Sequence, residues 1–260
     1  MADKIGIVYF SGTKNTEFIS QSIKNVLEKW DEKVDLINIE KDKIIPTDYK
    51  YLIIGGPVYI DRYPDILIKY AKQNLKDYKN KCMLFTTQAS EKDSTAYQHF
   101  INEMPNLSVT YCMYVPMPNN VYNFFFKKTL EEKQDEMIKN SIDIIENGLK
   151  EFRDGKIKLY SRNKITVFMI NLVYKMVYPR FISLINKKIN IDRAKCIDCR
   201  LCEKSCPAGC IKIDNGVSHT KECIFCQRCL NICPKNAFLY KDKEISQYKP
   251  RFKELEKSEQ

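Results

Sequence analysis

The sequence has only two histidines, and no catalytic arrangement forms around either of them. His99 and His219 stand far apart in the 260-residue chain, without the serine and aspartate partners of a hydrolase triad. No pair of carboxylates is placed for general acid–base catalysis either. We therefore expect no catalytic residues and interpret both histidines as structural.

Two common nucleotide-binding fingerprints are also missing. The chain has no G-x-x-x-x-G-K-[ST] loop, which disfavours ATP hydrolysis, and no G-x-G-x-x-G turn of the dinucleotide-binding type. A phosphate site in this chain would therefore need a loop of another kind.

Long apolar runs are scarce as well. The longest, "ITVFMINLVYKMVY", has 14 residues and contains Asn171 and Lys175, whereas a bilayer span needs about 20. The amino terminus, "MADKIGIVYF", lacks the basic and apolar regions of a secretory signal. We expect a cytoplasmic protein without a transmembrane segment, in a reducing compartment where clustered cysteines indicate metal rather than disulfides.

Cysteine, by contrast, is abundant and ordered. Eight of the 11 cysteines form two copies of C-x2-C-x2-C-x3-C-P, one in "CIDCRLCEKSCP" and one in "CIFCQRCLNICP". Three thiolates at this spacing can bind three irons of one 4Fe–4S cluster, while the fourth cysteine of the run binds the neighbouring cluster. We assign one cluster to Cys196, Cys199, Cys202 and Cys233, and the other to Cys223, Cys226, Cys229 and Cys206.

Other uses of these cysteines fit less well. Structural zinc would take two separated pairs, disulfides conflict with a reducing compartment, and a single-cluster module would lack some of the eight ligands. The remaining Cys82, Cys112 and Cys210 fall outside both ligand sets, and we expect them to be packed thiols.

Residues 190–241 resemble a bacterial-type ferredoxin with two 4Fe–4S clusters, and all eight ligand positions match. The resemblance implies a small α+β domain of short antiparallel strand pairs and short helices, related by a pseudo-twofold axis. The segment "IKIDNGVSH" predicts a hairpin whose turn contains Asp214, Asn215 and Gly216. "AFLYKDKE" is its weaker copy.

The amino-terminal half alternates strands and helices. Apolar strands are expected at 5–10, 33–39, 51–56, 81–87 and 107–115, with helices at 15–30, 64–75, 93–103 and 127–152. Five strands separated by helices predict an α/β fold with a parallel sheet covered on both faces. Ligands of such sheets bind beyond the carboxyl ends of the strands.

The loop "FSGTKNT" follows the first of those ends. Its backbone N–H groups at a helix N-terminus, with the hydroxyls of Ser11, Thr13 and Thr16, suit a phosphate. A helix cap without a ligand is the alternative. The third and fourth strands end in "GGPVYIDRYPD" and "TTQAS".

These loops, and residues 3–153 as a whole, resemble the flavodoxin family, which implies a doubly wound five-stranded sheet that binds FMN. The implied FMN-binding residues are Ser11, Gly12, Thr13, Lys14, Asn15 and Thr16 in the first loop, Gly56, Pro57, Val58 and Tyr59 in the second, and Thr86, Thr87 and Gln88 in the third. Tyr59 is the expected stacking aromatic, and Tyr63, Tyr97 and Tyr122 are candidates for the other ring face. Lys14 stands where the family usually has glycine.

Both halves and their order resemble the flavodoxin–ferredoxin fusion proteins, or flavo-ferredoxins, of anaerobic bacteria and archaea. The expected parts are a flavodoxin-like FMN-binding domain (1–153), a basic and apolar helical linker (154–190), a two-cluster ferredoxin domain (191–241) and a C-terminal tail (242–260). The end of this tail, "FKELEKSEQ", is expected to be solvated. Two alternatives stay open for the linker: a helix clamped between the domains, or a helix that docks on a membrane surface or a partner.

The charge fits anionic cofactors better than nucleic acid. The formal net charge is +10, but two oxidised clusters with their thiolates and one FMN, at about −2 each, leave about +4. We therefore expect no nucleic-acid partner.

The resemblance implies an electron-transfer protein in which clusters and FMN exchange electrons with a redox partner protein. Two other functions stay open. One is a flavoenzyme that reduces a small molecule at FMN with electrons from the clusters, and the other is a redox- or oxygen-sensing module. A carrier is favoured over an enzyme, and a homodimer over a monomer.

Overall fold

The computed structural model describes residues 3–42, 48–90 and 94–252. Within it the chain forms two compact units. The first contains Met1–Asn119, Thr129–Val167 and Pro250–Gln260, and the second contains Asn120–Lys128 and Phe168–Lys249. Each unit is described by itself.

The first unit is built on a five-stranded parallel sheet. Its strands are β1 (Lys4–Tyr9), β2 (Lys33–Asn38), β3 (Tyr51–Pro57), β4 (Lys81–Gln88) and β5 (Ser108–Pro116). They lie in the order β2-β1-β3-β4-β5, which is the doubly wound, flavodoxin-like order. Because both faces are covered, the central strands are almost continuously apolar, and the predicted α/β fold is confirmed.

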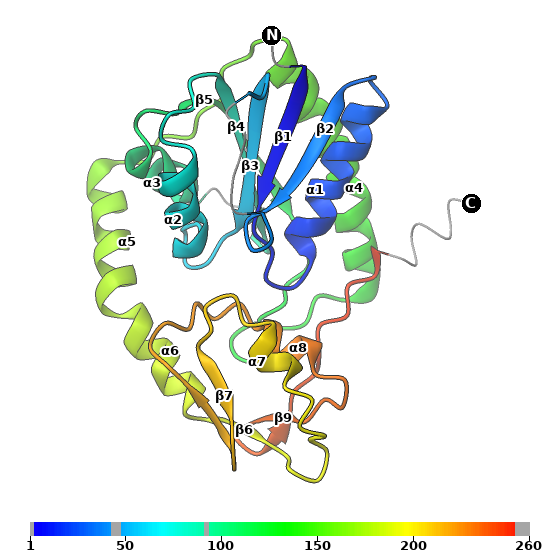
Figure 1. Cartoon of the computed structure of the whole chain (residues 1–260), viewed down its shortest axis with the longest axis vertical. Helices are drawn as coiled ribbons and strands as arrows, with labels where there is room; N and C mark the ends of the chain where they lie inside the picture. The colour runs from blue at the N-terminus through cyan, green and yellow to red at the C-terminus, as the bar shows by residue number, and fades with distance from the viewer. Residues whose placement is uncertain (1–2, 43–47, 91–93, 253–260) are drawn as a thin grey trace. The chain divides into compact units, whose positions relative to one another are not determined.

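Four helices cover the two faces of this sheet. Figure 1 shows α1 (Asn15–Glu28) and α4 (Glu131–Arg153) on one side, and α2 (Asp65–Asn74) and α3 (Ala96–Glu103) on the other. Ile19, Ile23 and Val26 recur at helical spacing on α1 and join the main core. The adjacent glycines Gly55 and Gly56 allow close packing, each toward a different face.

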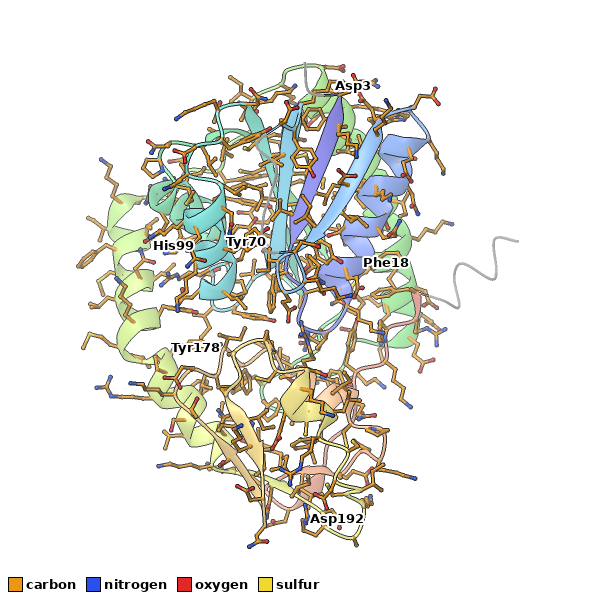
Figure 2. The ribbon with its side chains drawn as sticks, in the orientation of Figure 1. Asp3, Phe18, Tyr70, His99, Tyr178 and Asp192 are labelled. Carbon is orange, nitrogen blue, oxygen red and sulfur yellow. The ribbon has the colours of Figure 1, made fainter. Side chains whose placement is uncertain are left out.

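The carboxyl-terminal segment of the described chain packs on the first unit. Phe252 is buried and its ring stacks on that of Phe18, labelled in Figure 2, with 4.2 Å between the centroids. Arg251 donates to both carboxylate oxygens of Asp135 at 2.8 and 3.1 Å. The expectation of a solvated tail end is therefore wrong for Phe252, and residues 253–260 lie outside the described chain.

The second unit has the small antiparallel sheets expected of a ferredoxin-like domain. A hairpin joins β7 (Ile211–Ile213) and β8 (Val217–His219), as predicted. A second sheet has the order β10-β9-β6, from β10 (Lys243–Glu244), β9 (Phe238–Tyr240) and β6 (Ile189–Ile191). Two short helices, α7 (Leu201–Lys204) and α8 (Arg228–Ile232), follow the cysteine loops.

A short aromatic segment between β5 and α4 belongs to this second unit. The ring of Phe124 lies 5.1 Å from that of Phe225 and 4.8 Å from that of Tyr240. The Asn123 amide donates to the Ser246 carbonyl at 2.7 Å and accepts from the Ser246 N–H at 2.9 Å. The helix predicted at 127–152 therefore starts four residues too early, and α4 begins at Glu131.

The linker forms two consecutive helices, α5 (Lys164–Met176) and α6 (Tyr178–Asn186). Pro179 lies in the first turn of α6, where a proline is tolerated. Among the described residues, one helical stretch, Lys164–Asn186, is by its length and composition long and apolar enough to cross a membrane, and most of it is exposed.

The close packing at Gly55 generates a testable prediction. A Cβ atom at this position would lie 1.9 Å from the ring of Phe85 on the neighbouring strand. We expect Gly55→Ala to lower the free energy of unfolding by about 1–3 kcal/mol, the usual range for overpacking, in urea denaturation. If the ring is the cause, Gly55→Ala combined with Phe85→Leu will be less destabilising than the sum of the two single changes. Additive effects would contradict this explanation.

Candidate functional site

The first and third predicted loops are joined at the carboxyl edge of the sheet. The hydroxyls of Thr16 and Thr87 are 2.7 Å apart and both side chains are buried. The Asn15 amide donates to the carbonyl of Pro118 at 3.0 Å, just beyond β5. In this hydrogen bond one hydroxyl donates and the other accepts. The accepting hydroxyl can therefore donate its own proton to another group.

Lys14 marks the start of α1 and adopts a glycine-like backbone. Its φ is 78°, in the left-handed region that is uncommon for residues with a side chain. Its carbonyl accepts the N–H of Phe18 at 2.9 Å, so α1 begins directly after it. The exposed ammonium group of Lys14 is thus carried at a helix N-terminus, where N–H groups and positive charge both favour an anion.

The second predicted loop ends in a tight turn. Tyr59 and Arg62 exchange backbone hydrogen bonds of 2.8 and 3.3 Å, and Ile60 and Asp61 between them have φ of 46° and 55°. Two successive positive values define a type I′ turn, for which glycine and asparagine are preferred. An exposed isoleucine in this conformation is strained, and such strain is common at binding sites.

A buried arginine anchors this turn. Arg62 is 4% exposed, and its guanidinium nitrogen lies 2.6 Å from Nε2 of His99, which is 2% exposed and labelled in Figure 2. Because arginine can only donate, His99 accepts through Nε2 and is the neutral tautomer with the proton on Nδ1. The hydroxyl of Thr95 donates to the Asp61 carbonyl at 2.8 Å. His99 is therefore structural, as expected, whereas the role of Arg62 was not predicted from the sequence.

The third loop is only partly at the sheet edge. Thr86 is fully buried, and its hydroxyl lies 3.1 Å from that of Tyr97. The carbonyl of Thr87 accepts the N–H of Val58 at 3.1 Å, which joins the second and third loops. The Gln88 amide donates to the Ser90 carbonyl at 2.9 Å.

Two of the candidate stacking aromatics are core residues. Tyr63 and Tyr97 are both 0% exposed, and the Tyr63 hydroxyl donates to the Phe85 carbonyl at 2.8 Å. Neither ring can cover a flavin at the sheet edge, so that expectation is wrong. Tyr122 belongs to the second unit. Partly exposed Tyr59 keeps its place in the second loop.

These loops suit a terminal phosphate followed by a flat ring. Ser11 and Thr13 supply buried hydroxyls, Lys14 supplies a positive charge, and the N-terminus of α1 supplies N–H groups. The second and third loops, held together through Val58 and Thr87, can flank a ring. The donor set therefore fits FMN.

The first group of cysteines lines one pocket in the second unit. Cys196, Cys199, Cys202 and Cys233 all line it, together with apolar side chains that include Ile191, Ile213 and Phe238. Burial raises the pKa of the Cys202 thiol, and Cys233 contributes to this rise as a neighbour. The last cysteine of the second run thus lies with the first three of the first run.

The second group of cysteines contains the first three cysteines of the second run and the last cysteine of the first run. Burial, with the neighbouring thiols of Cys226, Cys223 and Cys206, raises the pKa of Cys229 well above its usual value. Burial raises that of Cys226 to about 12. Across the described residues, no three His, Cys, Asp or Glu side chains converge on a single-ion site. A cubane needs no such convergence, because each thiolate binds a different iron, and four thiolates per group fit this donor chemistry.

The backbone repeats in the two cysteine loops. Positive φ occurs at three pairs of positions 27 residues apart: Asp198 and Phe225 (50° and 56°), Arg200 and Gln227 (57° and 59°), and Gly209 and Asn236 (58° and 47°). Left-handed residues in such loops turn backbone N–H groups toward one side, which favours an anionic group. The repeated sequence is therefore also a repeated loop conformation.

The side chain of Cys210 departs from this repeat, because the matching residue of the second loop is an alanine. Its N–H donates to Sγ of Cys206 at 3.4 Å, as the N–H of the matching Ala237 donates to Cys233 at 3.4 Å. Only Cys210 adds a thiol, which lies 3.5 Å from Sγ of Cys206. Hydrogen bonding with Cys206 and Cys223 raises the pKa of the Cys210 thiol. The hydrogen bond from Cys210 in turn lowers the pKa of Cys206.

The other two cysteines are core residues, as predicted. Cys82 and Cys112 are 0% exposed, and burial raises the pKa of each thiol to about 12. Cys210 is buried too, but its contact with the candidate cluster ligands was not foreseen. Aligning the two runs, which pairs Cys210 with Ala237, is the sequence signal that could have revealed it.

Comparisons with known proteins agree with both units. A family model described as a flavodoxin domain matches residues 6–177, and one described as a 4Fe-4S binding domain matches residues 188–211. The flavodoxin of Fusobacterium nucleatum bound to flavin mononucleotide is similar at 16% identity and a TM-score of 0.42, over 60% of this chain and 99% of that one.

Two curated relatives match locally. NADH-quinone oxidoreductase subunit I 2 of Geobacter metallireducens is 34% identical over 84 residues, which are 27% of this chain and 64% of that protein. An uncharacterized protein of Methanocaldococcus jannaschii is 30% identical over 83 residues, which are 28% of this chain and 33% of that protein. The chain thus spans less than two thirds of the length of either relative.

The strand order and the loops at the sheet edge define a doubly wound α/β protein with a ferredoxin-type 4Fe–4S domain. The chain belongs to the flavodoxin domain family. A flavodoxin domain implies FMN, and a 4Fe–4S domain implies an iron–sulfur cluster. Together they indicate an electron-transfer flavo-iron–sulfur protein.

Lys14 allows a test of the phosphate site. Replacement by glycine removes the charge and the left-handed strain together, whereas replacement by alanine removes only the charge. We expect both variants to bind FMN about 5-fold more weakly, for a loss of about 1 kcal/mol, in fluorescence titrations of the flavin-free protein. Only Lys14→Gly should raise the free energy of unfolding of that protein, by about 1 kcal/mol. Unchanged FMN affinity in both variants would remove Lys14 from the site.

Proposed function

We propose that this chain is an electron carrier in which two 4Fe–4S clusters relay electrons between FMN and a redox partner protein. The observation that carries the proposal is the division of eight cysteines into two groups, each completed by a cysteine of the other run. A flavin exchanges one or two electrons, and each cluster exchanges one.

The proposed ligands of one cluster are Cys196, Cys199, Cys202 and Cys233, and those of the other are Cys223, Cys226, Cys229 and Cys206. The exchange of fourth ligands supports two clusters rather than one, because a single cluster would leave four cysteines of the repeat unused. It also ties the two loops together, so the clusters hold a small domain whose own apolar core is limited.

The proposed FMN site consists of the three loops at the carboxyl edge of the first sheet. Ser11 to Thr16 bind the phosphate, and Gly56 to Tyr59 with Thr86 to Gln88 lie against the ring. Within the third loop, Thr87 and Gln88 are the residues nearer the edge, since Thr86 is bonded to Tyr97 inside the fold. The residues of these loops orient the flavin and position its phosphate, and none of them needs to act as an acid or a base.

The exchange of ligands can be tested by matched cysteine variants. We expect Cys206→Ala and Cys226→Ala to remove the same cluster, so both should keep about four of eight irons per chain and give the same residual EPR spectrum in the reduced state. Cys233→Ala and Cys199→Ala should give the other spectrum. A Cys206→Ala protein whose spectrum matches that of Cys199→Ala would refute the exchange.

Cys210 is expected to raise the reduction potential of one cluster. A thiol hydrogen bond to a ligand sulfur stabilises the additional negative charge of the reduced cluster. If that bond differs by about 0.5–1.5 kcal/mol between the two redox states, Cys210→Ala lowers one midpoint potential by about 20–60 mV in an EPR-monitored titration. The other potential should not move.

Two further variants are controls for this effect. Cys210→Ser keeps a hydrogen-bond donor and should recover much of the shift. Ala237→Cys places a thiol at the matching position of the other run and should raise the other potential. Equal shifts of both potentials in Cys210→Ala would indicate a general structural disturbance instead.

Relay within one molecule predicts a particular rate law. After rapid reduction of the clusters, we expect flavin absorbance to change with a first-order rate that is independent of protein concentration, because both centres belong to one chain. Stopped-flow measurements at several protein concentrations check this. The Cys206→Ala, Cys233→Ala double variant, which should lack both clusters, provides the baseline. A rate proportional to protein concentration would mean that the centres exchange electrons only by collision.

A further inference from the structure

The helices α5 and α6 carry a concentration of exposed apolar side chains. Eleven of the seventeen large apolar side chains that are exposed in the described chain lie between residues 157 and 184. Phe168 is 65% exposed and Leu184 is 58% exposed. We define the outer face of α5–α6 by its members: Phe168, Met169, Leu172, Val173, Met176, Val177, Phe181 and Leu184.

The opposite face of these helices is committed to the core of the second unit. Tyr174, Tyr178, Ile182 and Ile185 recur every three or four residues and are all buried in that core. The Tyr178 hydroxyl, whose residue is labelled in Figure 2, donates to the carbonyl of Ile224 at 3.2 Å. Rotating the helices to bury the outer face would therefore expose this core.

The surrounding charge selects an anionic partner. Residues 168–191, which all belong to the second unit, contain four lysines and arginines and no aspartate or glutamate. Lys175 and Arg180 are exposed within the helical stretch itself, and Lys187 and Lys188 are exposed just beyond it. Long basic side chains can extend from an apolar surface to reach anionic headgroups while their stems remain in contact with it.

A second copy of the chain is a poor match for this surface. A twofold contact would place the same face against itself and bring its positive charges together without any acidic residue between them. Protein interfaces form about one hydrogen bond per 100–200 Å². The outer face of α5–α6 has few polar side chains that could form such bonds with a protein partner. Lipid tails require no such bonds.

The same contacts argue against a membrane-spanning arrangement. The stretch Lys164–Asn186 is long enough to cross a bilayer by its length and composition. However, one of its faces packs in the second unit, and Lys175 and Arg180 stand within it. A helix that is apolar on one exposed side, basic around it and packed on protein behind suits the plane of the bilayer surface.

We propose that the outer face of α5–α6 docks this protein on the surface of an anionic lipid bilayer. The apolar side chains enter the headgroup boundary, and the basic side chains of the same unit, Lys175, Arg180, Lys187 and Lys188, bind anionic headgroups. The proposal depends on this surface alone and does not require either cofactor.

Flotation of the full-length protein with vesicles tests the proposal. We expect binding to vesicles of phosphatidylcholine with phosphatidylglycerol, at least tenfold weaker binding to phosphatidylcholine alone, and release by high salt. Failure of the wild-type protein to bind the anionic vesicles would overturn the proposal. Bound protein that only detergent can release would overturn the in-plane arrangement.

Matched variants locate the contact. Phe168→Ser and Leu184→Ser should each reduce binding to the anionic vesicles roughly tenfold, the scale for loss of one inserted apolar side chain. Leu130→Ser, at a residue 77% exposed outside this surface, should bind like the wild type. Lys175→Gln with Arg180→Gln should reduce the preference for anionic lipid. All variants should keep the wild-type circular dichroism.

Two outcomes for the variants would contradict the proposal. An equal loss of binding in Leu130→Ser would show that attachment is not specific to the outer face. The other outcome is that the wild-type protein does not bind vesicles and Phe168→Ser halves the molecular mass measured by sedimentation. The surface would then be an interface between two copies of this chain.

Discussion

Both candidate sites depend on a single backbone requirement, the left-handed turn that directs N–H groups toward an anion. Glycine meets this requirement without a steric penalty, yet the chain has only eight glycines in 260 residues. Lys14 and Ile60 adopt positive φ in the flavin loops, and Asp198 and Phe225 do so in the cysteine loops. The surrounding structure must therefore hold these residues in conformations that they do not prefer.

The contacts that meet this requirement differ between the two units. In the first unit they are hydrogen bonds between side chains, such as Thr16 with Thr87 and Arg62 with His99, and these side chains stand on a sheet that is covered on both faces. The second unit has short strands and helices of four or five residues beside its cysteines. There the metal ligands themselves must supply much of the constraint, as is usual in small metal-binding domains.

Elements that depend on local contacts could be predicted from the sequence, and those that depend on distant contacts could not. The five strands were predictable because a sheet buried on both faces leaves continuous apolar runs, and the eight cysteines because their spacing repeats. The sequence did not predict the positions of three aromatic residues, Phe124, Phe252 and Tyr63. An aromatic residue near a loop has the same local sequence pattern whether it packs in a core or binds a ligand. Their positions depend on Phe225, Phe18 and the Phe85 carbonyl, which are distant in the sequence.

The excess positive charge of the chain is concentrated in one segment, which the net charge alone does not reveal. Residues 155–191 hold eight of the ten excess positive charges, so the rest of the chain is close to neutral. Two oxidised clusters and FMN would add about −6 to that remainder. The loaded protein would then have one strongly basic, apolar segment and an otherwise acidic balance. Such a separation can orient the molecule in an electrostatic field, whether that of a charged surface or of a redox partner, in a way that a uniform charge of the same total could not.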